Sequence, residues 1–143
     1  MAKYQYGKLS KKRMKGVNYW LVLCANIALS NCKKYDQTIP WMGGLRLAED
    51  QNRIFKNGAS QLDGYKEKSY HQSGNALDVV PYHKGKADYK CEKGFREFAK
   101  CMFNAWQYIQ KRYPQARRYR LEYGGHWMNF VDNPHWQLIE IAL

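Results

Sequence analysis

The stretch Ser-Tyr-His-Gln-Ser-Gly-Asn-Ala-Leu-Asp, residues 69–78, decides how the chain has to fold. It carries an imidazole at His71 and a carboxylate at Asp78. On one continuous helix, the seven-residue spacing from His71 to Asp78 would separate the two side chains by about 10 Å, at about 1.5 Å per residue. That separation is too large for a shared metal ion with bonds of about 2 Å. We therefore predict a bend at Gly74, followed by a strand that turns Asp78 back toward His71.

A second stretch, Asp-Asn-Pro-His-Trp at residues 132–136, supplies another carboxylate and another imidazole. Its proline has no N–H and favours extended backbone before it, so we expect Asp132 and His135 in a turn at the start of the last strand. Both side chains can then face one cavity. A set of two imidazoles and one carboxylate binds zinc and leaves a fourth position for water. The candidate ligands are His71, Asp78 and His135.

Asp132 has a different candidate role from the three ligands. A carboxylate three residues before a zinc ligand is well placed to take the proton from metal-bound water, whose pKa zinc lowers to about 7. A plainer interpretation exists for each residue: both histidines are ordinary loop residues, and both aspartates are turn or capping residues. For any one of these residues taken alone, the plainer interpretation is the stronger one.

The hydrophobic pattern outside these stretches predicts three helices. Apolar residues on one side of a 3.6-residue period indicate an amphipathic first helix, and apolar residues at three- and four-residue steps indicate a long third helix that Pro114 stops. The second helix is closed by Gly58. We expect helices within residues 17–32, at 48–56 and at 95–109.

Extended segments fill much of the remaining chain. We expect a polar loop over residues 59–75 and a strand that ends at Pro81. The expected extended segments are residues 37–42, 76–80, 118–123 and 136–141. This order predicts an α+β architecture, with helices packed on a small, mostly antiparallel sheet and one domain over residues 1–143.

Charge and composition narrow the function classes. The 143 residues include 24 Lys and Arg against 12 Asp and Glu, a net charge of +12, and 45% of the residues are hydrophobic. This hydrophobic content excludes a disordered chain. The positive field attracts polyanions, which include nucleic acid, anionic lipid and an acidic bacterial wall. Charge alone does not choose among these partners.

The cysteines and the N-terminal region bear on where the chain works. The four cysteines are Cys24, Cys32, Cys91 and Cys101. They form no Cys-x-x-Cys pair, so we expect reduced, mostly buried thiols and synthesis in the cytoplasm.

The N-terminal region has two interpretations. Basic residues before the apolar residues 19–25 also resemble a signal peptide, so residues 17–32 are either an export signal or the first helix. No run reaches the roughly 18 apolar residues of a membrane span, and we predict no integral membrane segment.

The two polar stretches together carry a resemblance to a known family. The patterns Ser-x-His-x-x-Gly-x-Ala-x-Asp and Asp-x-Pro-His-Trp resemble the zinc peptidases of bacterial walls. These peptidases include the D-Ala-D-Ala carboxypeptidases of the vancomycin-resistance type and, more similar, the L-alanyl-D-glutamate peptidases that serve as bacteriophage endolysins. Residues 44–51 and 55–58 resemble that family's Gly-x-Arg-x-x-x-x-Gln helix, and residues 6–17 resemble its N-terminal stretch.

The resemblance implies a fold and a set of roles. The fold would be hedgehog/D-Ala-D-Ala-peptidase-like, with a zinc site at the sheet edge. Zn²⁺ would be held by His71, Asp78 and His135, and Asp132 would be the general base. Arg46 would hold the substrate carbonyl or carboxylate as charge develops, a role that suits a fixed guanidinium.

The resemblance also implies a function and its setting. The chain would cleave the peptide stem of bacterial peptidoglycan at the L-alanyl-D-glutamate bond during host lysis, with an anionic wall surface as its partner. It would act as a monomer, made in the host cytoplasm and released to the wall by a separate pore-forming protein. The enzymatic alternative is a D-Ala-D-Ala carboxypeptidase with the same chemistry. A nucleic-acid-binding protein would explain the charge and exposed aromatics such as Tyr119 and Tyr123, but not the histidines and aspartates.

Five further residues complete the sequence-based expectations. We expect His126 to support the centre from behind or to lie at its rim, rather than to bind the metal. Glu122 is a weaker candidate for the base. Ser69 can orient a ligand and Gln51 can line the cleft, although structural roles are open for both. His83 matches no motif and is expected to be exposed.

Overall fold

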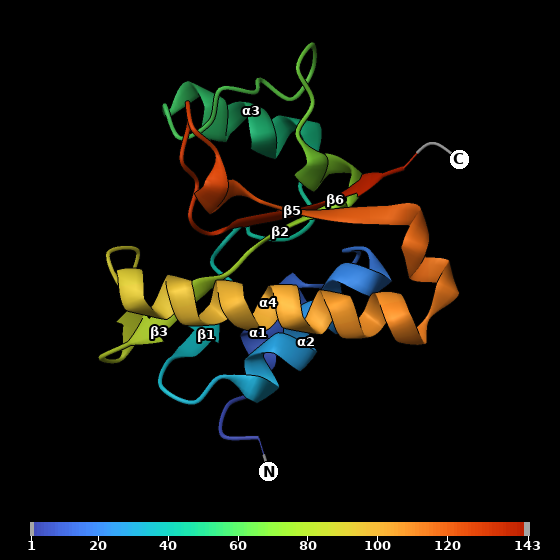
Figure 1. Cartoon of the computed structure of the whole chain (residues 1–143). Helices are drawn as coiled ribbons and strands as arrows, with labels where there is room; N and C mark the ends of the chain where they lie inside the picture. Colours follow the sequence, from blue (N-terminus) through green and yellow to red (C-terminus); the bar gives the residue numbers. More distant parts are fainter. Residues whose placement is uncertain (1, 142–143) are drawn as a thin grey trace.

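A computed structural model describes residues 2–141 of the chain, and Figure 1 shows its arrangement. The helices are α1 (Lys8–Arg13), α2 (Tyr19–Asn31), α3 (Ala48–Lys56) and α4 (Glu92–Arg112). The strands are β1 (Asp36–Thr38), β2 (Ala76–Asp78), β3 (Val80–His83), β4 (Lys86–Ala87), β5 (Tyr119–Tyr123) and β6 (His135–Glu140). Three short 3₁₀ helices are η1 (Tyr70–Ser73), η2 (Pro114–Arg118) and η3 (Gly124–His126). The predicted α+β class is confirmed.

The strands form two small antiparallel sheets rather than the single sheet we expected. One sheet has the order β2-β6-β5 and the other the order β1-β3-β4. The expected strand over residues 76–80 is divided between them, because β2 ends at Asp78 and β3 begins at Val80. Pro81 lies inside β3 and does not end it, since its carbonyl still accepts from the Asp88 N–H at 2.8 Å and its fixed φ suits extended backbone.

The core lies between α2, α4 and the β2-β6-β5 sheet. In Figure 1, α4 crosses the middle of the molecule with α2 on one side and this sheet on the other. The predicted helical stripes are the buried faces: α2 buries Leu21, Cys24, Ala25, Ala28 and Leu29, and α4 buries Phe95, Phe98, Met102, Ala105, Trp106 and Ile109. From the sheet, β6 adds Trp136 and Leu138 to the same core. This packing fixes the start of β6, where one of the candidate ligands stands.

The helix ends follow local sequence signals. Asn18 caps α2 by accepting a hydrogen bond from the Trp20 N–H at 2.9 Å. The predicted second helix is confirmed as α3, and α4 ends at Arg112, ahead of Pro114 as predicted. The six-residue α1 was not predicted, because so short a segment shows no hydrophobic period. No helix in the described residues has the length and apolar character to cross a membrane.

Candidate metal centre

Three side chains from two strands and one 3₁₀ helix meet at one point. His71 comes from η1, Asp78 from the end of β2, and His135 from the start of β6. Asp78 and His135 are directly opposite each other in the antiparallel β2-β6 pair. The predicted bend is confirmed: Gly74 ends η1 in the left-handed region at φ +79°, which a glycine adopts without strain.

The distances between the three side chains match a zinc site. His71 Nε2 lies 3.2 Å from His135 Nδ1 and 3.2 Å from Asp78 Oδ1, and His135 Nδ1 lies 3.4 Å from Asp78 Oδ1. A tetrahedral zinc ion with bonds of about 2.0–2.1 Å separates its ligand atoms by about 3.3 Å. Asp78 Oδ1 is buried and makes no hydrogen bond. The three atoms therefore face a common point that a divalent ion fits.

The electrostatics of Asp78 support an ionised ligand. Burial alone would raise the pKa of Asp78, but the two imidazoles beside it hold that pKa well below its usual range. Its other oxygen, Oδ2, accepts a hydrogen bond from Arg46 Nη2 at 3.2 Å. One carboxylate oxygen is thus directed to the centre and the other to a guanidinium.

A backbone carbonyl fixes the tautomer of His71. Its Nδ1 lies 2.9 Å from the carbonyl oxygen of Gly44. Because a carbonyl only accepts, Nδ1 carries a proton, and the neutral ring therefore presents the lone pair of Nε2 to the centre. Ser69 caps the 3₁₀ helix and accepts from the His71 N–H at 3.1 Å, so this serine has a structural role.

A row of hydrogen bonds fixes the tautomer of His135. The carboxylate of Glu122 accepts from Gln137 Nε2 at 3.0 Å and from Trp127 Nε1 at 2.9 Å. The amide of Gln137 therefore turns its oxygen, Oε1, toward His135 Nε2, which lies 2.7 Å away. Since that oxygen only accepts, His135 Nε2 carries a proton, and the neutral ring therefore presents the lone pair of Nδ1 to the centre. Glu122 lies behind His135 and does not line the cleft.

Arg46 is held rigidly at the edge of the centre. Its Nε donates to the Met42 carbonyl at 2.7 Å, and Nη1 donates to Gln51 Oε1 at 2.9 Å. With the bond to Asp78, the contacts of the described residues use three of its five N–H donors. Gln51 is fully buried and positions this arginine instead of lining the cleft.

Asp132 stands in the predicted turn at the start of β6. Its carbonyl accepts from the His135 N–H at 3.1 Å, and its own N–H donates to the Gly124 carbonyl at 2.9 Å. A Cβ at Gly124 would lie 2.5 Å from the Asp132 carbonyl oxygen, so this close approach requires glycine. Burial raises the pKa of Asp132 and the charge of Asp78 raises it further, although neighbouring imidazoles and a guanidinium oppose the shift. A carboxyl group with a raised pKa suits proton transfer near neutral pH.

The three candidate ligands, Arg46 and Asp132 line one cleft of about 600 Å³. Its walls combine apolar and aromatic side chains from several segments of the chain. They include Trp41, Met42, Ile54, Leu62, Tyr70, Tyr89, Trp127 and Phe130. Trp41 and Tyr89 are largely exposed, at 66% and 57%. A cleft with apolar and aromatic walls and a few convergent polar groups has the character of a ligand-binding site.

The structure places other sequence candidates outside the cleft. His126 does not line it: its ring stacks on Phe103 of α4, with centroids 5.6 Å apart. Tyr123 is buried against Trp136, so the expectation that it is exposed is wrong. His83 is partly exposed and lies 3.5 Å from Asp88.

Sequence reasoning missed Gln137, which orients one of the candidate ligands. The signal was present, because side chains two positions apart on a strand lie on the same face. His135 and Gln137 have this spacing in the last strand. The cross-strand partner of Gln137, Glu122, is set by a register that a single sequence does not reveal.

Comparison with known proteins shows the family of this chain. The family model described as phage L-alanyl-D-glutamate peptidase matches residues 2–139. The chain belongs to this family. A curated L-alanyl-D-glutamate peptidase of Listeria phage A118 is 36% identical over 97 residues, which cover 65% of this chain and 27% of the relative. The match thus spans about a quarter of the curated relative's length.

A solved structure shares the fold of this phage L-alanyl-D-glutamate peptidase family member. The crystal structure of the Serratia marcescens L-Ala D-Glu endopeptidase ChiX matches with a TM-score of 0.75 and 24% identity. The match covers 94% of this chain and 90% of that chain. The likeness agrees with the α+β fold predicted from the sequence.

Proposed function

We propose that this family member is a zinc-dependent endopeptidase that cleaves the L-alanyl-D-glutamate bond of peptidoglycan peptide stems. It serves as a phage endolysin in host cell lysis. One observation carries the proposal: His71, Asp78 and His135 direct three ligand atoms, 3.2–3.4 Å apart, to one point in the cleft. Family membership supplies the bond that is cut.

The residues of the cleft have complementary roles in this reaction. Zinc, when bound by His71, Asp78 and His135, supplies Lewis acidity to a carbonyl and lowers the pKa of water. Asp132 takes the proton of the attacking water on its carboxylate and returns it to the leaving amine. Arg46 has two N–H donors that are not used in its contacts with Met42, Gln51 and Asp78. These donors stabilise the negative charge on the carbonyl oxygen.

The setting of the enzyme follows from the same proposal. The enzyme acts as a monomer in this proposal, with His71, Asp78 and His135 of one chain as the complete set of protein ligands. The anionic wall is the partner of the +12 chain, and no specific nucleic acid is expected. The protein is made in the host cytoplasm and reaches the wall through a separate pore-forming protein. Expression in a bacterium with and without such a pore protein tests this route, because lysis should require both.

Mass spectrometry of digested peptidoglycan tests the activity. We expect new amino groups on D-Glu, with the glycan strands intact. Free D-Ala as the main product would identify the carboxypeptidase alternative instead. New reducing ends would contradict both peptidase assignments. A DNA mobility-shift titration beside this assay tests the nucleic-acid alternative.

A further inference from the structure

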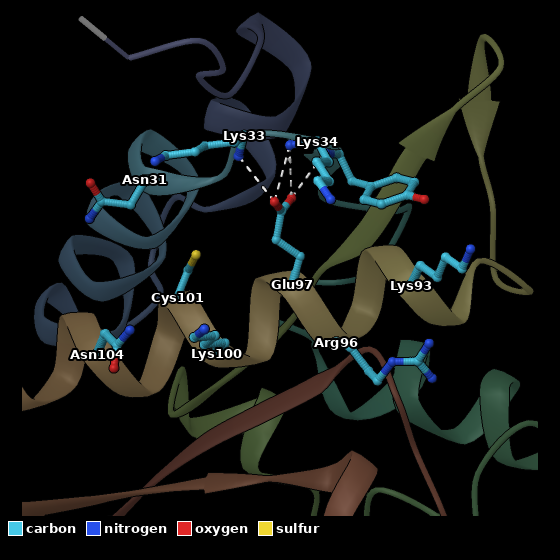
Figure 2. A pocket seen from close by; sticks show the side chains of 10 residues that line it. Asn31, Lys33, Lys34, Lys93, Arg96, Glu97, Lys100, Cys101 and Asn104 are labelled. Atoms are coloured by element: carbon cyan, nitrogen blue, oxygen red, sulfur yellow. Dashed lines mark hydrogen bonds between the residues drawn. The ribbon is translucent and has the colours of Figure 1, made fainter.

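A second pocket lies between α4 and the segment that joins α2 to β1 (Figure 2). Its volume is about 850 Å³, and it shares no lining residue with the cleft of the metal centre. Among the described residues, its lining contains one carboxylate, Glu97, and five cationic side chains. These are Lys33, Lys34, Lys93, Arg96 and Lys100, which we call the basic pocket residues.

The fold brings these cations together from two segments of the chain. Lys93, Arg96 and Lys100 are three and four positions apart on α4, so they lie on one face of the helix. Lys33 and Lys34 follow the end of α2, which packs against α4. All five side chains are exposed to solvent.

The single carboxylate of the pocket is occupied by backbone groups. Glu97 accepts hydrogen bonds from the N–H groups of Lys33 at 3.1 Å, Lys34 at 3.1 Å and Tyr35 at 2.9 Å, which Figure 2 shows as dashed lines. These bonds fasten the segment after α2 to α4. Glu97 thus has the structural role of holding the two lysines in place, and its oxygens are directed to the backbone.

The charges of the pocket lysines are not neutralised by neighbouring carboxylates in ion pairs. Within the described part of the chain, none of the four lysines forms an ion pair, and Arg96 has only a distant partner, Glu92 at 3.9 Å. Uncompensated charges of one sign in a concave surface raise the local concentration of anions. The cleft of the metal centre has a different character, because no lysine lines it.

We propose that the basic pocket binds carboxylate groups of peptidoglycan peptide stems and so holds the enzyme on the wall, outside the catalytic cleft. The proposal rests on the proposed function, because it takes the substrate polymer as the partner. Stems repeat along a glycan strand, and each carries free carboxylates. Neighbouring stems therefore offer anions to the pocket while one stem occupies the cleft, and the two weak contacts act together.

Two matched variants test the role of the pocket. One combines Lys33→Gln, Lys34→Gln, Lys93→Gln and Lys100→Gln. The control combines Lys8→Gln, Lys11→Gln, Lys12→Gln and Lys15→Gln, which are also exposed. Both sets remove four positive charges, so they separate the pocket from total charge. Binding is measured by co-sedimentation with sacculi stripped of proteins and phosphate polymers at low salt, and cleavage with a soluble stem peptide.

The pocket variant should bind stripped sacculi about tenfold more weakly than the native chain, and the control should change by less than about twofold. Both variants should cleave the soluble peptide at the native rate, which also shows that they are folded. Equal losses in both variants, or no loss in either, would overturn the proposal. A loss seen only on sacculi that keep their phosphate polymers would overturn it in favour of a phosphate partner. If the native chain leaves the soluble peptide uncut, the proposed function fails, while the binding assay still decides the role of the pocket.

Discussion

Replacement of Gln137 by leucine should weaken metal binding without touching a metal ligand. Gln137 lies between His135 and Glu122, with hydrogen bonds of 2.7 Å and 3.0 Å to them, and only 6% of its surface is exposed. Leucine fills a similar volume but leaves the His135 Nε2–H without an acceptor. The imidazole is then free to move its proton to Nδ1, which would direct a proton instead of a lone pair at the ion.

The structure sets the size of this effect. Nε2 of His135 then lacks a partner in either tautomer, and a buried polar atom without a partner costs about 1–3 kcal/mol, so the metal-free fold should lose about 2 kcal/mol of stability. At roughly 3 °C per kcal/mol for a chain of this size, the melting temperature should fall by about 6 °C. Loss of a group that orients a metal ligand typically reduces metal affinity by about 10- to 100-fold, and we expect Gln137→Leu in that range.

Competition with a chromogenic zinc chelator measures the affinity, and circular dichroism on the metal-free protein measures the melting temperature. Glu122→Gln is the matched control. Its amide oxygen can still accept from Gln137 and Trp127, so its zinc affinity and activity should stay near native values. Native zinc affinity in Gln137→Leu would refute the role of Gln137 in fixing the tautomer of His135.

Three further predictions concern the metal, the base and the wall. A chelator should abolish activity, and His71→Ala and His135→Ala should each lose both zinc and activity; tight zinc retention in both would contradict the ligand assignment. Asp132→Asn should keep zinc and the fold but lose about 10²- to 10⁴-fold in rate, with substrate binding much less affected, whereas Asp78→Asn should lose zinc affinity. A nearly native rate in Asp132→Asn together with an inactive Glu122→Gln would move the base to Glu122. Wall binding should weaken as salt rises, because exposed charges are screened over about 8 Å at physiological ionic strength; binding that does not depend on salt would exclude the basic surface as the docking feature.

The local parts of the site could be predicted from the sequence because local signals determine them. His71 and Asp78 are seven residues apart, so they could not bind the same metal ion from one continuous helix. Gly74 is the residue that permits the bend between them. The turn before β6 follows from the chemistry of its proline in the same way. Both predictions are confirmed, although the assignment of the residues as zinc ligands and base remains a proposal.

The long-range parts of the site could not be predicted because register and tertiary packing determine them. The opposition of Glu122 and Gln137 depends on the pairing of β5 with β6. Gln51 positions Arg46 because the segment before α3 turns the arginine back toward that helix. A single sequence does not show this turn. His126 illustrates the opposite error: it stands near the site in sequence, but its ring stacks on Phe103 of α4.

The backbone hydrogen bond between Asp132 and Gly124 closes residues 125–131 into a loop whose two ends are held together. Asp132, the proposed general base, lies at one end of this loop. Met128 and Val131 in the loop are 95% and 59% exposed, and Phe130 lines the cleft. Sequence change at residues 128–131 is therefore decoupled from the position of Asp132, whereas Trp127 donates to Glu122 behind His135 and belongs to the centre. This four-residue segment can be changed to fit different stem peptides while the catalytic residues stay the same. For engineering, it is the first place to graft a new substrate preference.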